Sequence, residues 1–134
     1  FGERINFIFA IETNLALESK DAPEKFFVVP NDSLEQIQPG ETYTFSKVDG
    51  YEYHDRWWGI RISCRGVSDG LWMLPLKTIS QSENRIEQIY QATTLVHLYN
   101  IQLNTNDKKE FELSWRIIPI GEDSSKDREI NLFQ

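Results

Sequence analysis

Cysteine and histidine are scarce in this sequence, with one cysteine and two histidines among 134 residues. A single cysteine cannot form an internal disulfide, which favours a reducing, cytoplasmic compartment. Three such ligands cannot supply a structural zinc site. The aspartates stand singly in predicted turns, without the spacing of a calcium loop, and no glycine-rich loop leads into a lysine and a helix. The sequence therefore predicts no metal and no cofactor.

Long hydrophobic runs are also lacking. The apolar runs are only a few residues long, whereas a helix needs ~20 apolar residues to cross a bilayer. Acidic residues outnumber basic ones by 21 to 14, for a net charge of −7. An overall negative field disfavours non-specific binding to nucleic acid or to anionic lipid. The sequence predicts a soluble chain without a membrane partner.

Core-forming residues, by contrast, are plentiful. The chain is 40% hydrophobic and 13% aromatic, and a domain of this size can bury roughly two-thirds of its unfolded surface. We expect one domain over residues 1–121, followed by a charged tail or linker over residues 122–134. The first residue is Phe1 rather than methionine, and we interpret the chain as a domain of a larger protein.

Alternation of apolar and polar residues indicates strands along most of the chain. Turn residues at 49–50 and 66–70 predict reversals, and residues 104–109 predict a final hairpin. Ser82 can cap a short helix that ends at Ala92. The sequence thus predicts an all-β fold, either a single-domain β-sandwich or a small barrel such as the five-stranded oligonucleotide-binding kind. The seven expected strands are residues 4–12, 26–29, 41–46, 57–65, 71–79, 93–103 and 110–120.

The inward faces of these strands predict the core. In the strand over residues 57–65, even-numbered residues are apolar and odd-numbered ones are mostly polar. The same alternation in the other strands extends the predicted core to the first strand and the last. The residues expected to be buried together are Phe7, Phe9, Tyr43, Trp58, Ile60, Ile62, Leu113 and Trp115.

The sequence contains few residues that could form a catalytic site. The one thiol, Cys64, could pair only with His54 or His97, and it falls on the apolar face of its strand, where free cysteine behaves as a small hydrophobe. His97 shares a face with apolar neighbours and is interpreted as a core histidine, whereas His54 lies in a predicted loop. A pair of acids for glycoside hydrolysis cannot be recognised from sequence, because the separation of the carboxylates is not visible. We expect no enzymatic activity.

The best candidate for a binding surface is the outward face of the strand over residues 57–65. This stretch carries arginines in an otherwise acidic chain and is preceded by two tyrosines. Aromatic planes beside guanidinium groups can stack a base or a sugar, or anchor a protein. The alternative is structural: Trp57 covers Gly59 and the arginines pair with acids. The candidate binding residues are Tyr51, Tyr53, Arg56, Trp57, Arg61 and Arg65.

These features predict a non-catalytic binding domain of a larger protein or assembly, with a protein partner preferred. The first alternative is a single-stranded nucleic-acid module of the oligonucleotide-binding kind. A carbohydrate-binding module and a small hydrolase follow. Salt separates the first two, because neutralising phosphates makes affinity fall steeply with ionic strength.

Overall fold

The computed structural model describes residues 3–16, 23–30 and 36–121. Within these ranges the chain is all-β, as the sequence predicts, and contains no helix. The predicted tail over residues 122–134 lies outside the described residues. The strands are β1 (Ile5–Leu15), β2 (Lys25–Val28), β3 (Tyr43–Asp55), β4 (Ile60–Ser82), β5 (Arg85–Leu103) and β6 (Ser114–Pro119).

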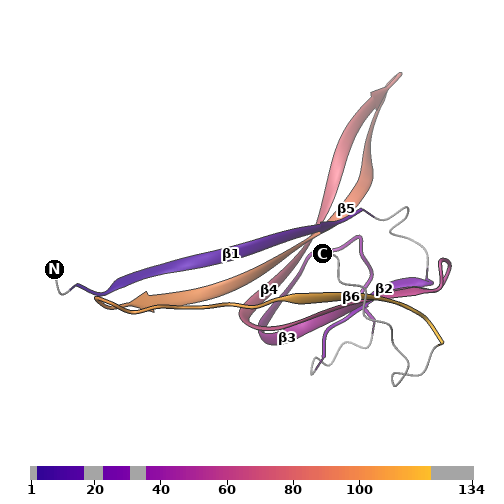
Figure 1. Ribbon diagram of the computed structural model, residues 1–134. Coiled ribbons are helices and arrows are strands. Elements are labelled where there is room, and N and C mark those ends of the chain that lie inside the picture. Colours follow the sequence, from indigo (N-terminus) through magenta and orange to yellow (C-terminus); the bar gives the residue numbers. More distant parts are fainter. Residues whose placement is uncertain (1–2, 17–22, 31–35, 122–134) are drawn as a thin grey trace.

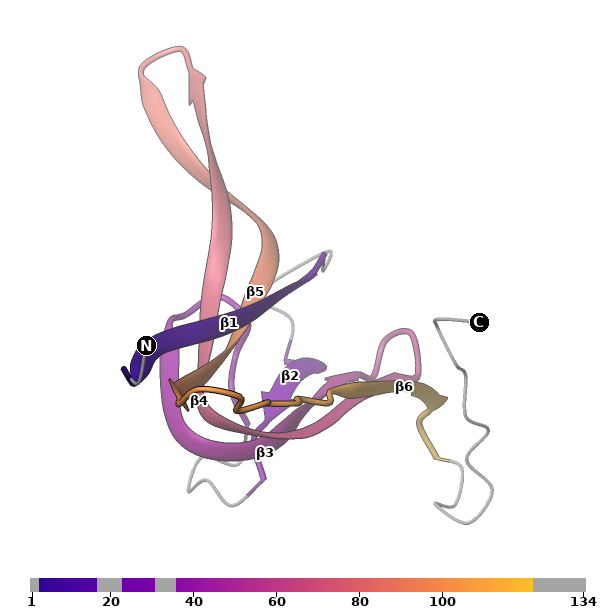
Figure 2. The ribbon, with the colours of Figure 1, turned by 60° about the vertical axis from the view of Figure 1, so that its left-hand side comes forward.

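A single antiparallel sheet folds over on itself to make the sandwich. The strand order is β1-β5-β4-β3-β2, and β6 pairs with β4. The long strands β3 and β4 are shared by both layers, because β5 and β1 join the second half of β4 whereas β6 joins its first half. Figures 1 and 2 show the resulting arrangement, with β1 and β5 crossing over the layer formed by β2, β3 and β6.

The bend in the sheet is made by a β-bulge in β3. The register between β3 and β4 shifts between Asp49 and Tyr51, and Gly50 between them has φ +95°. A bulge of this kind bends a strand and increases its twist. Asp49 and Gly50, predicted to form a turn between two strands, therefore lie inside one continuous strand.

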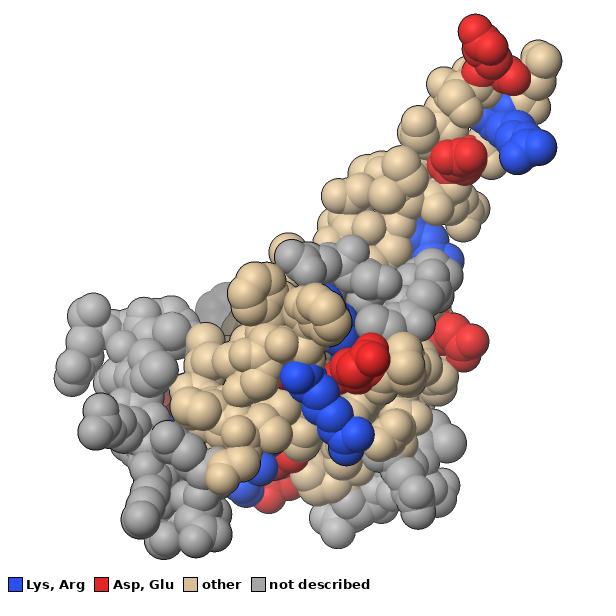
Figure 3. Space-filling view, turned by 90° about the vertical axis from the view of Figure 1, so that its right-hand side faces the viewer, with Lys and Arg blue, Asp and Glu red and all other residues tan. Residues whose placement is uncertain are grey.

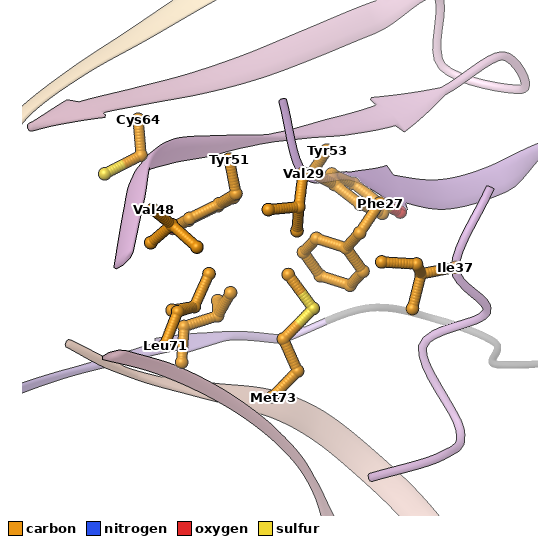
Figure 4. Packing of buried hydrophobic residues seen from close by; sticks show 10 residues of the cluster. Phe27, Val29, Ile37, Val48, Tyr51, Tyr53, Cys64, Leu71 and Met73 are labelled. Carbon is orange, nitrogen blue, oxygen red and sulfur yellow. The ribbon is translucent and has the colours of Figure 1, made fainter. Parts of the chain in front are cut away.

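The core fills the space between the two layers. Tyr51, Tyr53 and Phe27 point inward from one layer, and Leu71 and Met73 approach them from the other (Figure 4). These side chains are at most 1% exposed. The core cluster consists of Phe27, Val29, Ile37, Val48, Tyr51, Tyr53, Cys64, Leu71, Met73 and Leu95.

The reversal predicted over residues 66–70 is wrong. β4 runs unbroken through Gly66 and Gly70, so the two predicted strands on either side are one. Gly66 has φ +146°, and a Cβ there would meet the carbonyl oxygen of Glu112 at 2.5 Å. Gly66 is needed because the segment before β6 passes close to its backbone, and not because the chain reverses there.

The predicted helix from Ser82 to Ala92 is also wrong. These residues form the far end of a β4–β5 hairpin, which reverses at Glu83 and Asn84, where Asn84 has φ 87°. Residues 85–92 have good helix propensity, but each helical hydrogen bond is replaced by pairing with β4, and tertiary pairing of this kind overrides a weak local preference.

The predicted hairpin of residues 93–103 with residues 110–120 does not form. β5 pairs instead with β1 and β4, and β6 pairs with the first half of β4. Six strands rather than seven result within the described ranges. Both segments do alternate, but alternation does not specify which strand lies next to which.

Part of the predicted core lies elsewhere. Tyr43, Ile62, Leu113 and Trp115 are partly buried and pack against the core, whereas Phe7, Phe9 and Trp58 are 44%, 42% and 62% exposed. β1 is the terminal strand of the sheet order, so its apolar face has few neighbours. Phe9 packs in a satellite cluster with Tyr99 and Phe111.

The far end of the β4–β5 hairpin projects from the body as a two-stranded arm (Figure 2). Over residues 77–90 each strand has only the other as its paired neighbour, because β3 pairs with β4 no further than Met73. An isolated two-stranded hairpin is marginally stable in water. Pro75 stands where this single-neighbour region of β4 begins, a place in a sheet that tolerates a residue without a backbone N–H.

We therefore expect the arm to open locally far more often than the body. Amide hydrogens of residues 77–90 should exchange in native buffer with opening free energies near zero, whereas those of the core strands should approach the global value. Hydrogen exchange followed by mass spectrometry measures both in one sample. Equal protection of the arm and of residues 51–55 would contradict this expectation.

Candidate functional site

The β3–β4 turn over residues 56–59, called here the hairpin tip, replaces the reversal expected further along the chain. The Oδ1 atom of Asp55 accepts a hydrogen bond from the backbone N–H of Trp58 at 2.9 Å. Gly59 follows with φ +66°, and its carbonyl oxygen accepts from the N–H of Ile120 at 2.8 Å. An aspartate that bonds the backbone ahead of it is a common turn initiator.

Buried groups anchor this tip to the body. The Oδ2 atom of Asp55 lies 3.7 Å from Nζ of Lys25, in a pair whose side chains are each 5% exposed. The hydroxyl of Tyr53 donates to the same oxygen at 3.3 Å. The N–H of Arg56 donates to the carbonyl of Glu24 at 2.9 Å. These contacts tie the turn to residues 24–25 on one side and to Ile120 on the other, while Tyr53 holds the Asp55 carboxylate from within β3.

Two adjacent tryptophans stand out from this anchored turn. Trp57 is 76% exposed and Trp58 is 62% exposed. Beside them the Arg56 guanidinium lies over the ring of Phe26, 5.2 Å from its centroid, and that ring stacks on His54. Large exposed aromatic side chains on a rigid support are unusual on a protein surface and mark interaction sites.

The structure separates the residues that the sequence groups into one face. Tyr51 and Tyr53, expected to face outward, are 0% and 1% exposed and belong to the core, so their placement on a binding surface is wrong. Across the turn over residues 56–59, Tyr51 and Tyr53 are opposite Cys64 and Ile62 and share their inward face, which alternation carried back from Trp57 could not reveal. Of the predicted binding residues, Arg56 and Trp57 are the two that belong to the hairpin tip.

Arg61 and Arg65 lie on β4, beyond the turn and not within it. Arg61 is paired with His54 of β3 and Ile118 of β6, and Arg65 is exposed. On the described part of the surface in Figure 3, basic and acidic side chains are interspersed and form no broad basic patch. A binding role for these arginines stays a prediction.

Trp58 is the functional candidate that sequence reasoning misses, because strand alternation places it in the core. The sequence does contain a local sign that Trp58 lies in a turn. Asp55 stands three residues before Trp58 and Gly59 directly follows it, a pattern typical of a side-chain-capped turn. Such a turn removes both tryptophans from the strand period.

Cys64 and His97 do meet, but in the core. The sulfur of Cys64 lies 3.9 Å from Nε2 of His97, and Tyr51 stacks on the imidazole with ring centroids 5.8 Å apart. Both residues are at most 2% exposed, which confirms the predicted burial. Burial raises the pKa of the Cys64 thiol to about 12. A neutral thiol that no substrate can reach is a poor nucleophile.

The buried imidazole should make stability depend on pH. Burial lowers the pKa of His97 below its ordinary value, so the unfolded state binds more protons just below pH ~6.5. The free energy of unfolding should be fully present above that pH and fall as the pH drops toward the folded pKa. Urea titrations between pH 8 and 5 measure this, and His97→Phe should flatten the slope.

No group of three or more metal-binding side chains occurs within residues 3–16, 23–30 and 36–121. In the same ranges the structure has no helix long and apolar enough to cross a membrane.

Comparison with known proteins gives the chain a family. Residues 2–113 match the family model described as alpha-amylase/4-alpha-glucanotransferase, C-terminal. The curated protein "Alpha-amylase 1" of Dictyoglomus thermophilum is 28% identical over 100 residues, which are 74% of this chain and 14% of that protein. The chain thus spans about one-seventh of the length of this relative. No solved structure matches the chain at a significant level. Because the family model covers most of its length, the chain belongs to the alpha-amylase/4-alpha-glucanotransferase C-terminal family.

Proposed function

We propose that this chain is a non-catalytic domain of an amylase-type enzyme and that its hairpin tip binds α-glucan. The observation that carries the proposal is the pair of adjacent tryptophans, 76% and 62% exposed, on a turn anchored by Asp55. The carbohydrate alternative from the sequence thereby takes precedence over the protein partner, which the comparisons do not support.

The chemistry of the tip suits a sugar polymer. A glucose ring presents a face of C–H groups that can pack flat on an indole ring, while the indole N–H can donate to a hydroxyl. The tip is anchored before a ligand arrives, so little conformational entropy is lost when the rings are covered. Arg56, positioned over Phe26, adds a donor at the edge of the site.

A catalytic role is not proposed, because the one thiol–imidazole pair is enclosed in the core. The proposed role is attachment: the domain holds polymeric substrate near the rest of the enzyme. A polymer bound at this surface raises the local concentration of substrate without any chemistry in the domain itself.

The test is binding of maltoheptaose to the purified chain, measured by isothermal titration calorimetry. Trp57→Ala and Trp58→Ala should each weaken affinity about tenfold, which corresponds to ~1.4 kcal/mol, and the double variant should lose more. Both side chains are mainly exposed, so thermal stability should hardly change. Cellohexaose, with β-linkages, should bind more weakly because its shape differs.

Ile86→Ala provides the matched control. Ile86 is also 76% exposed but lies on the arm, far from the tip in sequence and in the fold. Its truncation removes a similar exposed apolar surface and should leave maltoheptaose affinity unchanged. Unchanged affinity in both tryptophan variants, with intact folding, would refute the role proposed for the tip.

A further inference from the structure

A hollow lies on the outer face of the sheet, on the half of β4 that pairs with β5. It crosses β3, β4 and β5 and reaches β1, with a volume of about 420 Å³. Ser46 and Gly70 are cross-strand partners at its floor, and Trp72 with its partner Thr44 forms the next row. On the opposite side stand Asn100 and its partner Ile8.

The hollow exists because Gly70 has no side chain. Its flanking row carries Trp72, which is 43% exposed in the middle of a paired strand. A residue with its Cβ at position 70 would meet Leu98 at 3.5 Å, an ordinary contact, so the glycine is not required by packing. Gly70 is itself buried, and the side chain of Leu98 lies beside it, so the two residues together form the floor next to the Trp72 indole.

The polar side chains that line the hollow are mostly uncharged groups of the kind that bind sugar hydroxyls. Thr44, Ser46 and Asn100 offer hydroxyl and amide groups, each able both to donate and to accept, as sugar hydroxyls require. The one charged side chain in the lining, Asp69, accepts a hydrogen bond from the Asn100 backbone N–H at 2.7 Å. Across the four strands the hollow spans roughly 14 Å, three interstrand spacings, which is room for a short oligosaccharide.

We propose that this hollow is a second α-glucan site, in which a glucose ring packs on Trp72 over Gly70. The inference rests on the proposed function for its ligand class but not on the hairpin tip, since the two sites share no residue. The tip lies at the β3–β4 turn, whereas the hollow lies on the half of β4 that pairs with β5. A long chain of glucose could then engage both sites at once.

The sharpest variant fills the hollow instead of removing the aromatic ring. Gly70→Val places a β-branched side chain, of a type that strands favour, on the floor, where its Cβ would meet Leu98 at an ordinary 3.5 Å. It leaves the Trp72 indole in place, so a loss of binding reports on the space over position 70 and not on a missing ring. Trp72→Ala is the companion variant, and thermal denaturation checks that both fold.

The experiment measures maltoheptaose binding in the chain with and without the tip substitutions Trp57→Ala and Trp58→Ala. With the tip disabled, residual binding should remain, and Gly70→Val or Trp72→Ala should each weaken it at least tenfold. In the otherwise unaltered chain, the same changes should lower the ratio of the affinity for long amylose to the affinity for maltotriose. A long chain gains affinity by occupying both sites, and this gain is lost when one site is removed. Thr78→Val, on the exposed arm, is the control for adding a valine to β4.

The two proposals fail in different ways. If Gly70→Val and Trp72→Ala leave affinity unchanged in both backgrounds, the hollow is not a glucan site, while the tip proposal stands. If the tip variants bind as tightly as the unaltered chain and the hollow variants do not bind, the tip proposal fails and the second site carries the binding.

Discussion

Replacing Gly50 with alanine is expected to lower the free energy of unfolding by ~3–5 kcal/mol, although it adds only one methyl group. Gly50 has φ +95°, which residues with a Cβ rarely adopt, and the added Cβ would collide with the backbone carbonyl oxygen of Cys64. Backbone cannot move aside as a flexible side chain can. Typical domains have only about 5–15 kcal/mol in total, so this loss is a large fraction of the stability.

Gly59→Ala separates the two causes of this loss. Gly59 also has positive φ, +66°, but nothing lies within 4 Å of a Cβ built there. It should therefore lose only the conformational part, ~1–2 kcal/mol. Urea denaturation of both variants gives the comparison. Equal losses would mean that the bulge at Gly50 relaxes to admit the methyl group, and that the bend in the sheet is not held rigidly at this point.

Asp55→Ala should have the second large effect, a loss of ~3–5 kcal/mol. One carboxylate bonds the Trp58 N–H at 2.9 Å, receives the Tyr53 hydroxyl at 3.3 Å and lies 3.7 Å from the Lys25 ammonium. Alanine removes all three interactions from a site where both charged side chains are 5% exposed. The buried ammonium loses this carboxylate, which costs more than the pair itself contributes.

Two comparisons identify the cause. Asp107→Ala removes a similar turn bond, from Asp107 to the Asn104 N–H at 2.8 Å, but in an exposed loop, and it should cost no more than ~1 kcal/mol. Asp55→Asn keeps an oxygen that can accept from Trp58 while removing the charge, so it should lose stability yet retain more maltoheptaose binding than Asp55→Ala. A loss below ~1 kcal/mol for Asp55→Ala would show that the anchor contributes little.

Local chemistry accounts for what could be predicted of the candidate site. Arg56 and Trp57 are adjacent in the chain, and their side-chain chemistry alone makes this stretch a binding candidate; both residues are at the tip. The tyrosines preceding them face outward only if the alternation continues backward without a break. The turn capped by Asp55 lies between these tyrosines and Trp57 and interrupts that period, and it depends on contacts with other strands.

The sequence by itself determined that this protein is all-β, because alternating β-branched and aromatic residues suit strands and little else. It also determined that Cys64 and His97 are enclosed, since each lies among apolar neighbours on one strand face. Tertiary structure alone decided where the chain turns, which strands pair and which faces are covered. Periodicity states which residues share a face, but burial depends on what lies opposite. For this reason residues 85–92 became a strand, Tyr51 turned inward and two tryptophans were left at the surface.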